Sequence, residues 1–243
     1  MSTPIQRNAP FRGLLAWAVK FDPYHSVRRQ RRDQRIIDGI ALQLGRVDSL
    51  LDVGCGDGFI TRAVADRAGA RRVAGVELSV PPHGHVPIHR YNGRDLPFPD
   101  GSFEAVTLVD VLHHCEDPQR VLDEAVRVAK RKVVIKDHLA FGSKSRWVLR
   151  VMDRIGNAKE SFDARATYLS FDQWIRMSEH AKARFVSFEW PFKIHDLPWR
   201  LVAGSELHFT ATLLTLPPAP AAALATEPPL DGRAKPLGPT RPD

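Results

Sequence analysis

A run of glycines interleaved with acidic residues is the first place in this sequence where chemistry can be expected. The stretch LLDVGCGDGF holds three glycines at alternate positions: Gly54, Gly56 and Gly58. Glycine loses more conformational freedom on folding than any other residue, so this density is unfavourable inside a strand or a helix. An apolar run precedes the glycines and a helical pattern follows them, which predicts a strand-to-helix turn at a ligand site.

The acidic residues of this turn indicate the charge of the ligand. Asp52 precedes the first glycine, and Asp57 lies inside the turn. The nucleotide-binding pattern G-x-G-x-x-G has its third glycine one position later and receives a pyrophosphate, beside which a carboxylate is unfavourable. The spacing G-C-G-D-G therefore favours a neutral or cationic ligand, such as a sulfonium that also carries an ammonium group.

Two further carboxylates follow at spacings that suit a nucleoside. Glu77 ends the second apolar run, where it can accept hydrogen bonds from both hydroxyls of a ribose; the alternative is a surface carboxylate at a strand end. Asp95 follows a short third strand, where its carboxylate can accept the amine of an adenine while the backbone of Leu96 addresses the ring. An aspartate before Leu-Pro is also a common turn, which would explain Asp95 without a ligand.

Three histidines stand where a proton acceptor would be placed. His113 and His114 follow the fourth strand directly, and His138 follows the fifth. Histidine titrates near neutrality, which suits proton removal from an acceptor group. The pair in LHH also starts the next helix, so one of the two can equally pack or cap there. We interpret His113, His114 and His138 as candidate catalytic residues.

The elements that position these residues alternate between strand and helix. Strands are predicted over residues 48–54, 71–78, 103–112, 131–138, 183–192 and 206–216, and helices over residues 59–68, 118–129 and 170–181. This alternation predicts an α/β fold with a doubly wound, Rossmann-like sheet, since parallel strands need a crossover. The last two strands have no helix between them, so we expect them to be antiparallel neighbours at one edge.

Length and composition are those of one globular domain with flanking segments. The chain has 243 residues, of which 43% are hydrophobic, and we assign the domain to residues 46–215. Residues 1–45 are expected to form a helical, arginine-rich segment, and residues 140–172 a lid within the domain. Residues 216–243 are rich in proline and alanine and lack aromatic residues, which predicts a disordered tail.

Cysteine usage and hydropathy indicate the cellular compartment that is expected for the protein. Cys55 and Cys115 lie in no CxxC or Cys/His spacing, so neither a disulfide framework nor a metal site is expected. No apolar run reaches the ~18 residues of a membrane span, and no secretory signal is visible. We expect a cytoplasmic protein, and the sequence leaves its oligomeric state open.

The excess of basic residues has two interpretations. The net charge is +7, and five arginines gather in HSVRRQRRDQR: Arg28, Arg29, Arg31, Arg32 and Arg35. Such a stretch suits contact with nucleic acid or an anionic membrane surface, or it is the solvated face of a helix. No aromatic stacking platform is interleaved, which favours the helix face. No nucleic-acid partner is expected, whereas a peripheral membrane contact stays open.

Four segments together resemble the class I S-adenosylmethionine-dependent methyltransferases. They keep their order and spacing over residues 48–138 and are LLDVGCGDG, VAGVELS, GRDLPFPDGSFEAVTLVDVLHHCEDPQRVLDEAVRVA and KVVIKDH. The resemblance implies a seven-stranded, mostly parallel sheet with an antiparallel last strand, and S-adenosyl-L-methionine as the cofactor. The chain departs from the family in having no room for a helix between the second and third strands, and no Pro-Gly-Gly turn before the fifth.

The resemblance also implies roles for individual residues. The methionine part of the cofactor would be cradled by the glycine turn, the ribose held by a strand-end carboxylate, and the adenine met from the loop after the third strand. Residues 108–112 would line the cofactor near its sulfonium. The cofactor-binding residues are thus predicted to be Asp52, Gly54, Gly56, Asp57, Glu77, Asp95, Leu96 and Val109.

The segment after the fifth strand commonly covers the acceptor site in this family, so contacts with the methyl acceptor are expected there. Its aromatic and greasy side chains could wall a pocket, or form the core of a helical lid: Trp147, Met152, Tyr168, Phe171 and Trp174. We hypothesise a small-molecule acceptor, methylated on oxygen, nitrogen or carbon. One alternative is an RNA or DNA methyltransferase, although no added binding module and no Asn/Asp-Pro-Pro-Tyr tetrapeptide are visible. The other alternative is a catalytically silent cofactor-binding protein. The intact glycine turn argues against it.

Overall fold

The computed structural model of the protein describes residues 25–156, 166–195 and 205–216. Strand and helix alternate through most of the described chain, as the apolar pattern predicts. The elements are α2 (His25–Leu44), β1 (Ser49–Val53), α3 (Phe59–Ala68), β2 (Arg72–Glu77), β3 (Ile88–Arg90), β4 (Phe103–Val109), η1 (Leu112–His114), α4 (Pro118–Val128), β5 (Ala129–His138), α5 (Ser143–Gly156), α6 (Phe171–His180), β6 (Ala183–Glu189), η2 (Ser205–Leu207) and β7 (His208–Thr215).

The strands of the described residues form one seven-stranded sheet in the order β3-β2-β1-β4-β5-β7-β6. Neighbours from β3 to β5 pair in parallel, whereas β7 runs antiparallel to both β5 and β6. The predicted fold class, a doubly wound and mostly parallel sheet with an antiparallel last strand, is therefore confirmed. The strand order reverses between β1 and β4, and ligands of open α/β sheets bind at the carboxyl ends of strands at such a point.

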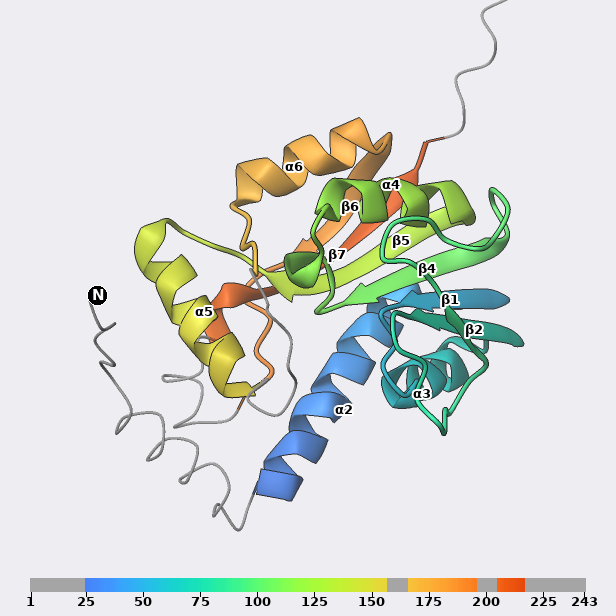
Figure 1. Ribbon diagram of the computed structural model, residues 1–243, viewed down its shortest axis with the longest axis horizontal. Helices are drawn as coiled ribbons and strands as arrows, with labels where there is room; N and C mark the ends of the chain where they lie inside the picture. The colour runs from blue at the N-terminus through green and yellow to red at the C-terminus, as the bar shows by residue number, and fades with distance from the viewer. Residues whose placement is uncertain (1–24, 157–165, 196–204, 217–243) are drawn as a thin grey trace, which may run out of the picture.

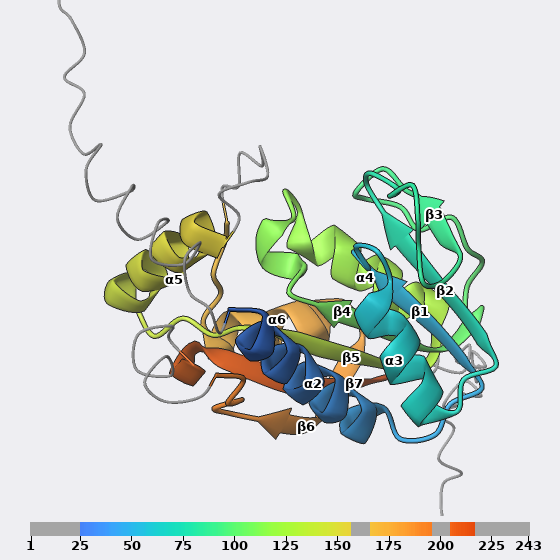
Figure 2. The ribbon, with the colours of Figure 1, turned by 90° about the horizontal axis from the view of Figure 1, so that it is seen from below.

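Helices cover both faces of this sheet. Figures 1 and 2 show α2 and α3 on one face, α4 and α6 on the other, and α5 beyond the carboxyl ends of the parallel strands. One apolar cluster joins the sheet to α4 and α6 around Leu122 and Trp174, and a second joins it to α2 and α3 around Ile36 and Val64. The central strands are buried on both sides, which explains their continuous apolar runs.

Several predicted boundaries change for physical reasons. The fourth strand was expected to reach residue 112, but β4 ends at Val109, because Asp110 takes a left-handed backbone conformation with φ of 58°. No helix lies between β2 and β3, and α4 passes directly into β5, as the two departures from the family pattern predicted. The last two strands are antiparallel neighbours at one edge, as expected.

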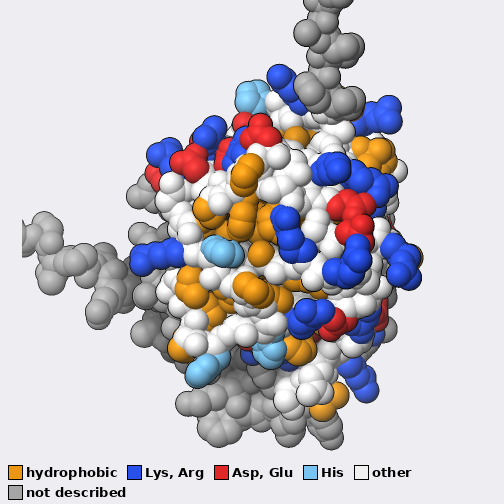
Figure 3. Space-filling model, turned by 90° about the vertical axis from the view of Figure 1, so that its right-hand side faces the viewer, with side chains coloured by type: hydrophobic (Ala, Val, Ile, Leu, Met, Phe, Trp, Pro, Cys, Tyr) orange, Lys and Arg blue, Asp and Glu red, His pale blue; other side chains and the backbone are white. Residues whose placement is uncertain are grey.

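The arginine-rich segment is helical where the structure describes it. α2 buries one apolar stripe against the sheet: Ile36, Ile37, Ile40 and Leu44. Among the described helices, none combines the length and the apolarity needed to cross a bilayer. Figure 3 shows one side of the molecule, on which lysine and arginine side chains are spread more widely than acidic ones, around a central group of hydrophobic side chains and histidines. The tail and residues 157–165 of the expected lid lie outside the described residues.

Candidate active site

The glycine turn lies at the reversal point of the sheet, between the end of β1 and the start of α3. Gly54 has φ of 68°, and a Cβ there would lie 2.6 Å from a methyl group of Val111. Gly56 has φ of 56°, and a Cβ there would meet nothing within 4 Å. Both glycines need the left-handed conformation, but Gly54 is required for packing whereas Gly56 borders open space. The turn therefore leaves room for a ligand directly over Gly56.

Asp52 lies beneath this turn, inside the protein. The Thr61 and Thr107 hydroxyls both donate hydrogen bonds to its carboxylate, and the bond from Thr107 measures 2.7 Å. Burial raises the pKa of Asp52 to about 6, despite these two hydrogen bonds. The side chain thus joins β1 to α3 and β4, and it supports the turn from below.

Glu77 ends β2 beside the turn, as predicted. Its two carboxylate oxygens accept hydrogen bonds from the backbone N–H of Gly56 and of Leu78, both at 2.9 Å. The side chain is half-buried, so one side of the carboxylate faces away from the backbone. Each carboxylate oxygen can accept a second bond, which keeps Glu77 suited to hold two vicinal hydroxyls.

The other acidic residue of the turn, Asp57, is exposed. Its Oδ1 accepts the Phe59 N–H at 3.0 Å, and its carbonyl accepts the His85 N–H at 2.8 Å. Asp57 therefore fixes the first turn of α3 and ties it to the loop between β2 and β3. Val109, at the end of β4, is half-buried against the cluster that α2 and α3 share with the sheet.

The predicted adenine contacts are only partly supported. Asp95 is exposed, and the Arg120 guanidinium binds its Oδ1 at 2.6 Å, which holds the pKa of Asp95 below its usual range. The Leu96 N–H, expected to address a ring, instead donates to the buried Glu124 at 2.8 Å. The Leu96 side chain is also buried in the core. We therefore correct the expectation for Leu96, because Glu124, which is 28 residues away, already occupies its N–H.

The three candidate histidines lie close together around one buried carboxylate. The Asp137 carboxylate accepts a hydrogen bond from His113 Nδ1 at 2.6 Å, and the same oxygen lies 3.3 Å from His138 Nδ1. The His138 and Leu112 N–H groups bond the same carboxylate at 2.7 and 3.1 Å. Burial raises the pKa of Asp137, but His113 and His138 more than offset this and hold it below its usual range. Asp137 is therefore anionic and fixes the orientation of both imidazole rings.

The histidines differ in their access to a substrate. His113 is buried and stacks on Tyr168, with ring centroids 5.4 Å apart, while the half-buried His114 lies 4.0 Å from the His113 ring. The His138 side chain is 16% exposed, so it reaches the surface of the site. Burial lowers the pKa of His138, which leaves its ring mostly neutral at pH 7. Since its Nδ1 faces carboxylates, Nε2 is the nitrogen that can accept a proton.

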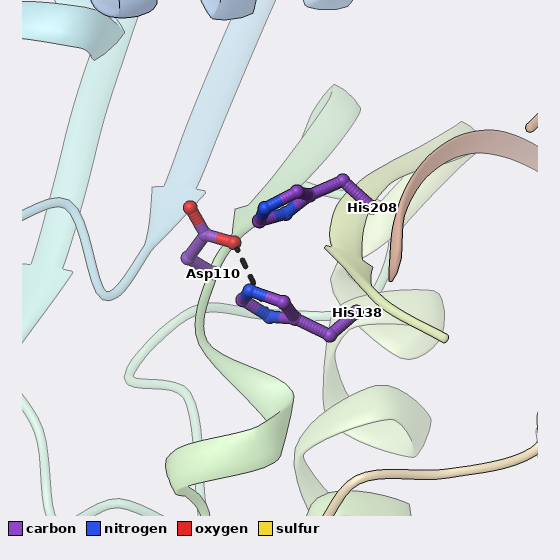
Figure 4. A group of neighbouring side chains, drawn as sticks. All are labelled: Asp110, His138 and His208. Carbon is purple, nitrogen blue, oxygen red and sulfur yellow. Dashed lines mark ion pairs between the residues drawn. The ribbon is translucent and has the colours of Figure 1, made fainter. Parts of the chain in front are cut away.

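A second charged group lies beside His138. It includes Asp110, from the stretch 108–112 that was expected to line the cofactor, together with Lys136 and His208, which the sequence analysis did not single out. Figure 4 shows Asp110, His138 and His208 converging from the ends of β4, β5 and β7. Asp110 Oδ1 lies 3.8 Å from His138 Nδ1 and 2.5 Å from the ammonium of the fully buried Lys136. Burial raises the pKa of Asp110, but Lys136, His138 and Arg32 more than offset this and hold it well below its usual range. Asp110 and Lys136 thus form an ion pair.

Two histidines and a carboxylate are also a common set of metal ligands. The ligand atoms of Asp110, His138 and His208 lie within 4.8 Å of one another. However, the Lys136 ammonium contacts Asp110 Oδ1 and lies 3.2 Å from His208 Nδ1, two of the three ligand atoms. A cation is therefore already supplied by the chain, and the expectation of no metal stays a prediction.

The aromatic residues of the expected lid have different positions. Trp174 on α6 is fully buried in the core, and its Nε1 donates to the His138 carbonyl at 3.3 Å, which favours the second alternative, a core residue, for this side chain. Tyr168 is buried against His113, whereas Trp147 and Phe171 are 66% and 43% exposed. Among these four described side chains, Tyr168 is thus the one whose ring packs on the histidine rings, those of His113 and His138. The Met152 side chain lies outside the described residues.

Comparison with known proteins is consistent with this geometry. Residues 51–135 match the family model described as a methyltransferase domain. The chain is 31% identical over 123 residues to a ubiquinone biosynthesis O-methyltransferase of Dechloromonas aromatica, which covers 46% of this chain and 50% of that protein. It is 35% identical over 158 residues to a demethylmenaquinone methyltransferase of Tropheryma whipplei, which covers 55% of this chain and 63% of that protein. The chain thus spans about half to two thirds of these relatives.

The fold is shared with solved structures of lower sequence identity. Geranyl diphosphate C-methyltransferase from Streptomyces coelicolor, in complex with Mg²⁺, geranyl diphosphate and S-adenosyl-L-homocysteine, superposes with a TM-score of 0.63 at 18% identity. The match covers 82% of this chain and 88% of that one. At this identity the similarity concerns the fold, and it confirms the arrangement of strands around the turn.

Proposed function

We propose that this protein transfers the methyl group of S-adenosyl-L-methionine to a hydroxyl of a small-molecule acceptor. Residues 51–135 match the model of a methyltransferase domain, and the fold is shared with a solved methyltransferase. The observation that carries the proposal is the meeting of the glycine turn with a buried histidine–carboxylate group at the carboxyl ends of β4 and β5. Val111 joins the two, since it packs on Gly54 and directly precedes η1, which carries His113.

The described residues fit the cofactor. The open space over Gly56 suits the methionine part, and Glu77 suits the ribose hydroxyls. Asp95 keeps a free side for the adenine amine, since Arg120 holds only its Oδ1 and Asn92 its Oδ2. When bound, the cofactor supplies an electrophilic methyl group on a sulfonium. Carboxylates beside the turn favour this cationic ligand over a nucleotide pyrophosphate.

His138 is the base that we propose for this reaction. In a hydroxyl acceptor the O–H proton passes to His138 Nε2 while the oxygen forms its bond to the methyl group and the sulfonium sulfur takes the electron pair of the broken S–C bond. A neutral imidazole can accept this proton at pH 7, and Asp137 and Asp110 stabilise the imidazolium that results. His113, which is buried on Tyr168, positions Asp137 in this scheme.

The presence of a placed base favours a hydroxyl or an acidic carbon as the acceptor over an amine. Methyl transfer to a hydroxyl needs proton removal, whereas a neutral amine is already nucleophilic. The names of the relatives support oxygen and quinone chemistry, since one is an O-methyltransferase of ubiquinone biosynthesis and another acts as a demethylmenaquinone methyltransferase. We propose an aromatic or quinol hydroxyl as the acceptor.

The test has two stages. Calorimetry should show binding of S-adenosylhomocysteine and none of NAD. The protein is then incubated with methyl-labelled S-adenosylmethionine and a panel of catechols, hydroquinones, aromatic amines and short RNA, and the labelled products are separated. We expect label on the hydroxylated aromatics. Binding of NAD alone, or label on RNA alone, would contradict the proposal.

A further inference from the structure

Lys136 places a charge in the interior of the molecule. Its side chain is fully buried in β5, whereas His138, two residues further along the strand, reaches the surface of the site. Taking an ammonium out of water is costly unless a carboxylate and other acceptors meet it. The contacts of Lys136 therefore indicate which group its charge serves.

Lys136 is joined to Asp110 twice. Its ammonium lies 2.5 Å from Asp110 Oδ1, and its backbone carbonyl accepts the Asp110 N–H at 2.7 Å. Asp110 has φ of 58°, a left-handed conformation that is uncommon for residues other than glycine and that persists only where the surroundings hold it. The two contacts with Lys136 thus fix both the backbone and the carboxylate of Asp110.

The carboxylate that is fixed in this way faces His138. Asp110 Oδ1, the oxygen that the Lys136 ammonium contacts, lies 3.8 Å from His138 Nδ1 (Figure 4). One oxygen therefore stands between a buried cation and the proposed base. An anion at this distance favours a protonated imidazole, and a cation behind the anion opposes this effect. Burial lowers the pKa of His138, Asp137 and Asp110 raise it, and Lys136 lowers it again.

The titratable and charged groups around His138 come from several elements. They are Asp137 and Lys136 on the same strand, Asp110 after β4, His113 on η1, Tyr168 before α6 and His208 on β7, with Arg32 of α2 behind Asp110. His208 Nδ1 accepts a hydrogen bond from the Lys136 ammonium at 3.2 Å, and burial lowers the pKa of His208 well below its usual value, so this ring is neutral. The Arg32 side chain is 33% exposed, where solvent screens its charge. Among these described groups, Lys136 is thus the fully buried ammonium that balances Asp110.

We propose that Lys136 is a positioning residue for the methyl transfer, because its ammonium holds Asp110 against His138 and balances the charge of that carboxylate. His138 then rests as a neutral base, and Asp110 is already in place to stabilise the imidazolium that forms. Because Lys136 is fully buried, it acts through Asp110 and His138 rather than on the acceptor itself. The inference rests on the proposed function, in which His138 is the base.

A set of variants separates this role from packing. Lys136→Met removes the ammonium and keeps a long side chain, Asp110→Asn removes the carboxylate, and the double variant removes both charges. The matched control is Lys132→Met, which makes the same change four residues earlier in β5, where the Lys132 ammonium donates to the Leu44 carbonyl at 2.6 Å. Thermal unfolding checks that each variant is folded.

NMR titration of the histidine rings measures the proton affinity of His138, whose signal is assigned by its loss in His138→Gln. This affinity should rise about tenfold in Lys136→Met and fall about tenfold in Asp110→Asn, because each variant removes one of two opposite charges beside the ring. In the double variant it should return close to that of the parent. Loss of packing alone does not produce opposite changes that cancel.

The rate of methyl transfer gives a second measurement, with the catechols and hydroquinones of the acceptor panel. On the acid side of the pH profile, kcat of Lys136→Met should fall about tenfold and recover as the pH rises, because more of the His138 ring is then protonated at a given pH. The KM for S-adenosylmethionine should not change. A merely structural role of Lys136 would lower the rate at every pH.

An unchanged proton affinity of His138 in both single variants, changes of the same sign, or an equal change in Lys132→Met would overturn the inference. If Lys136→Met does not fold, the fall in Asp110→Asn and its reversal in the double variant decide the question. Absence of methyl transfer by the parent protein contradicts the proposed function instead, and the NMR titration still shows whether Lys136 balances Asp110 beside His138.

Discussion

Single residues of the site have both a structural role and a proposed role in binding or catalysis. Glu77 holds the Gly56 N–H and would also hold the ribose, and Asp137 holds two imidazoles that differ in access. A substitution therefore changes both the shape of the site and its chemistry. Conservative variants with matched controls separate the two effects.

Glu77→Gln tests the ribose assignment. We expect the affinity for S-adenosylhomocysteine to fall at least about tenfold, because charge-assisted hydrogen bonds contribute ~1.5–3 kcal/mol each. Calorimetry measures the dissociation constant. The control is Glu104→Gln, which makes the same change at the amino end of β4, where Glu104 accepts the Asp48 N–H. An unchanged dissociation constant in Glu77→Gln would show that the ribose lies elsewhere.

His138→Gln tests the proposed base. We expect kcat to fall about 10²–10⁴-fold while affinity for S-adenosylhomocysteine changes little, because the base acts on the acceptor. In the parent protein the rate should rise with pH through the pKa of His138, which burial lowers below 6.5. The midpoint of this rise therefore lies on the acid side of the ordinary histidine pKa. The control His180→Gln changes a ring that is 68% exposed, and a comparable loss there would count against His138.

At the scale of elements, the turn between β1 and α3 has two glycines with different roles. Gly54 is needed for packing, whereas Gly56 borders the space proposed for the cofactor. Gly54→Ala should destabilise the fold, because the new methyl group would meet Val111 and the backbone is left-handed. Gly56→Ala meets no neighbour, so it should cost only about 1 kcal/mol of backbone strain. Its methyl group should nevertheless block the cofactor and abolish measurable binding. Thermal unfolding and calorimetry of both variants test this pair, and retained binding in Gly56→Ala would move the cofactor off the turn.

Asp52 links β1 to α3 and β4 through hydrogen bonds to its buried carboxyl group. This burial predicts that the stability of the protein depends on pH. The folded-state pKa of Asp52 is about 6, against 3.8 for the ordinary group, so the folded state binds a proton more tightly. The stability that this protonated carboxyl contributes is fully present below pH ~4 and is lost as the pH rises through about 6. The free energy of unfolding then falls by ~3 kcal/mol. Asp52→Asn cannot titrate. The difference between urea unfolding of parent and variant should follow this curve, and a flat difference would refute it.

At the scale of the whole molecule, α2 contributes +3 to the net charge of +7, from five arginines and two aspartates. Part of that charge is committed within the fold, since Arg32 bonds Asp110 and Arg35 bonds the Ile194 carbonyl. The helix also buries its apolar stripe against the sheet, so it cannot enter a nucleic-acid groove as a separate element. We interpret the rest of this basic surface as the solvated face of the helix.

Nucleic-acid binding should accordingly be weak. We expect labelled RNA and duplex DNA to bind above micromolar concentration at near-physiological salt, with no preference for sequence. Fluorescence anisotropy compares the parent with a variant in which Arg28, Arg29 and Arg31 are glutamine, which spares Arg32 and Arg35 and their bonds within the fold. Sub-micromolar binding that disappears in this variant would favour a nucleic-acid substrate.

The sequence by itself determined the order of strands and helices and the edge of the sheet at which the parallel strands end. The alternation of apolar runs and helical patterns predicts parallel strands, and parallel strands bring their carboxyl ends to one edge. The glycine turn, Glu77 and the three histidines could therefore be assigned to one site. The turn follows β1, Glu77 and His138 end β2 and β5, and His113 and His114 lie in the short helix η1 after β4. Local pattern suffices for this, because it depends only on neighbours in the chain.

The tertiary structure alone decided which polar groups pair with one another. Leu96 gives its N–H to Glu124, Arg32 reaches Asp110, and Lys136 is buried within a strand that α2 and α4 cover on opposite faces. None of these pairs has a local signal, because the partners lie tens of residues apart and burial fixes which side chains meet. A buried charge is stable only beside an opposite one, so the fold, rather than the motif, placed Lys136 and Asp110 together and set the charge of the site.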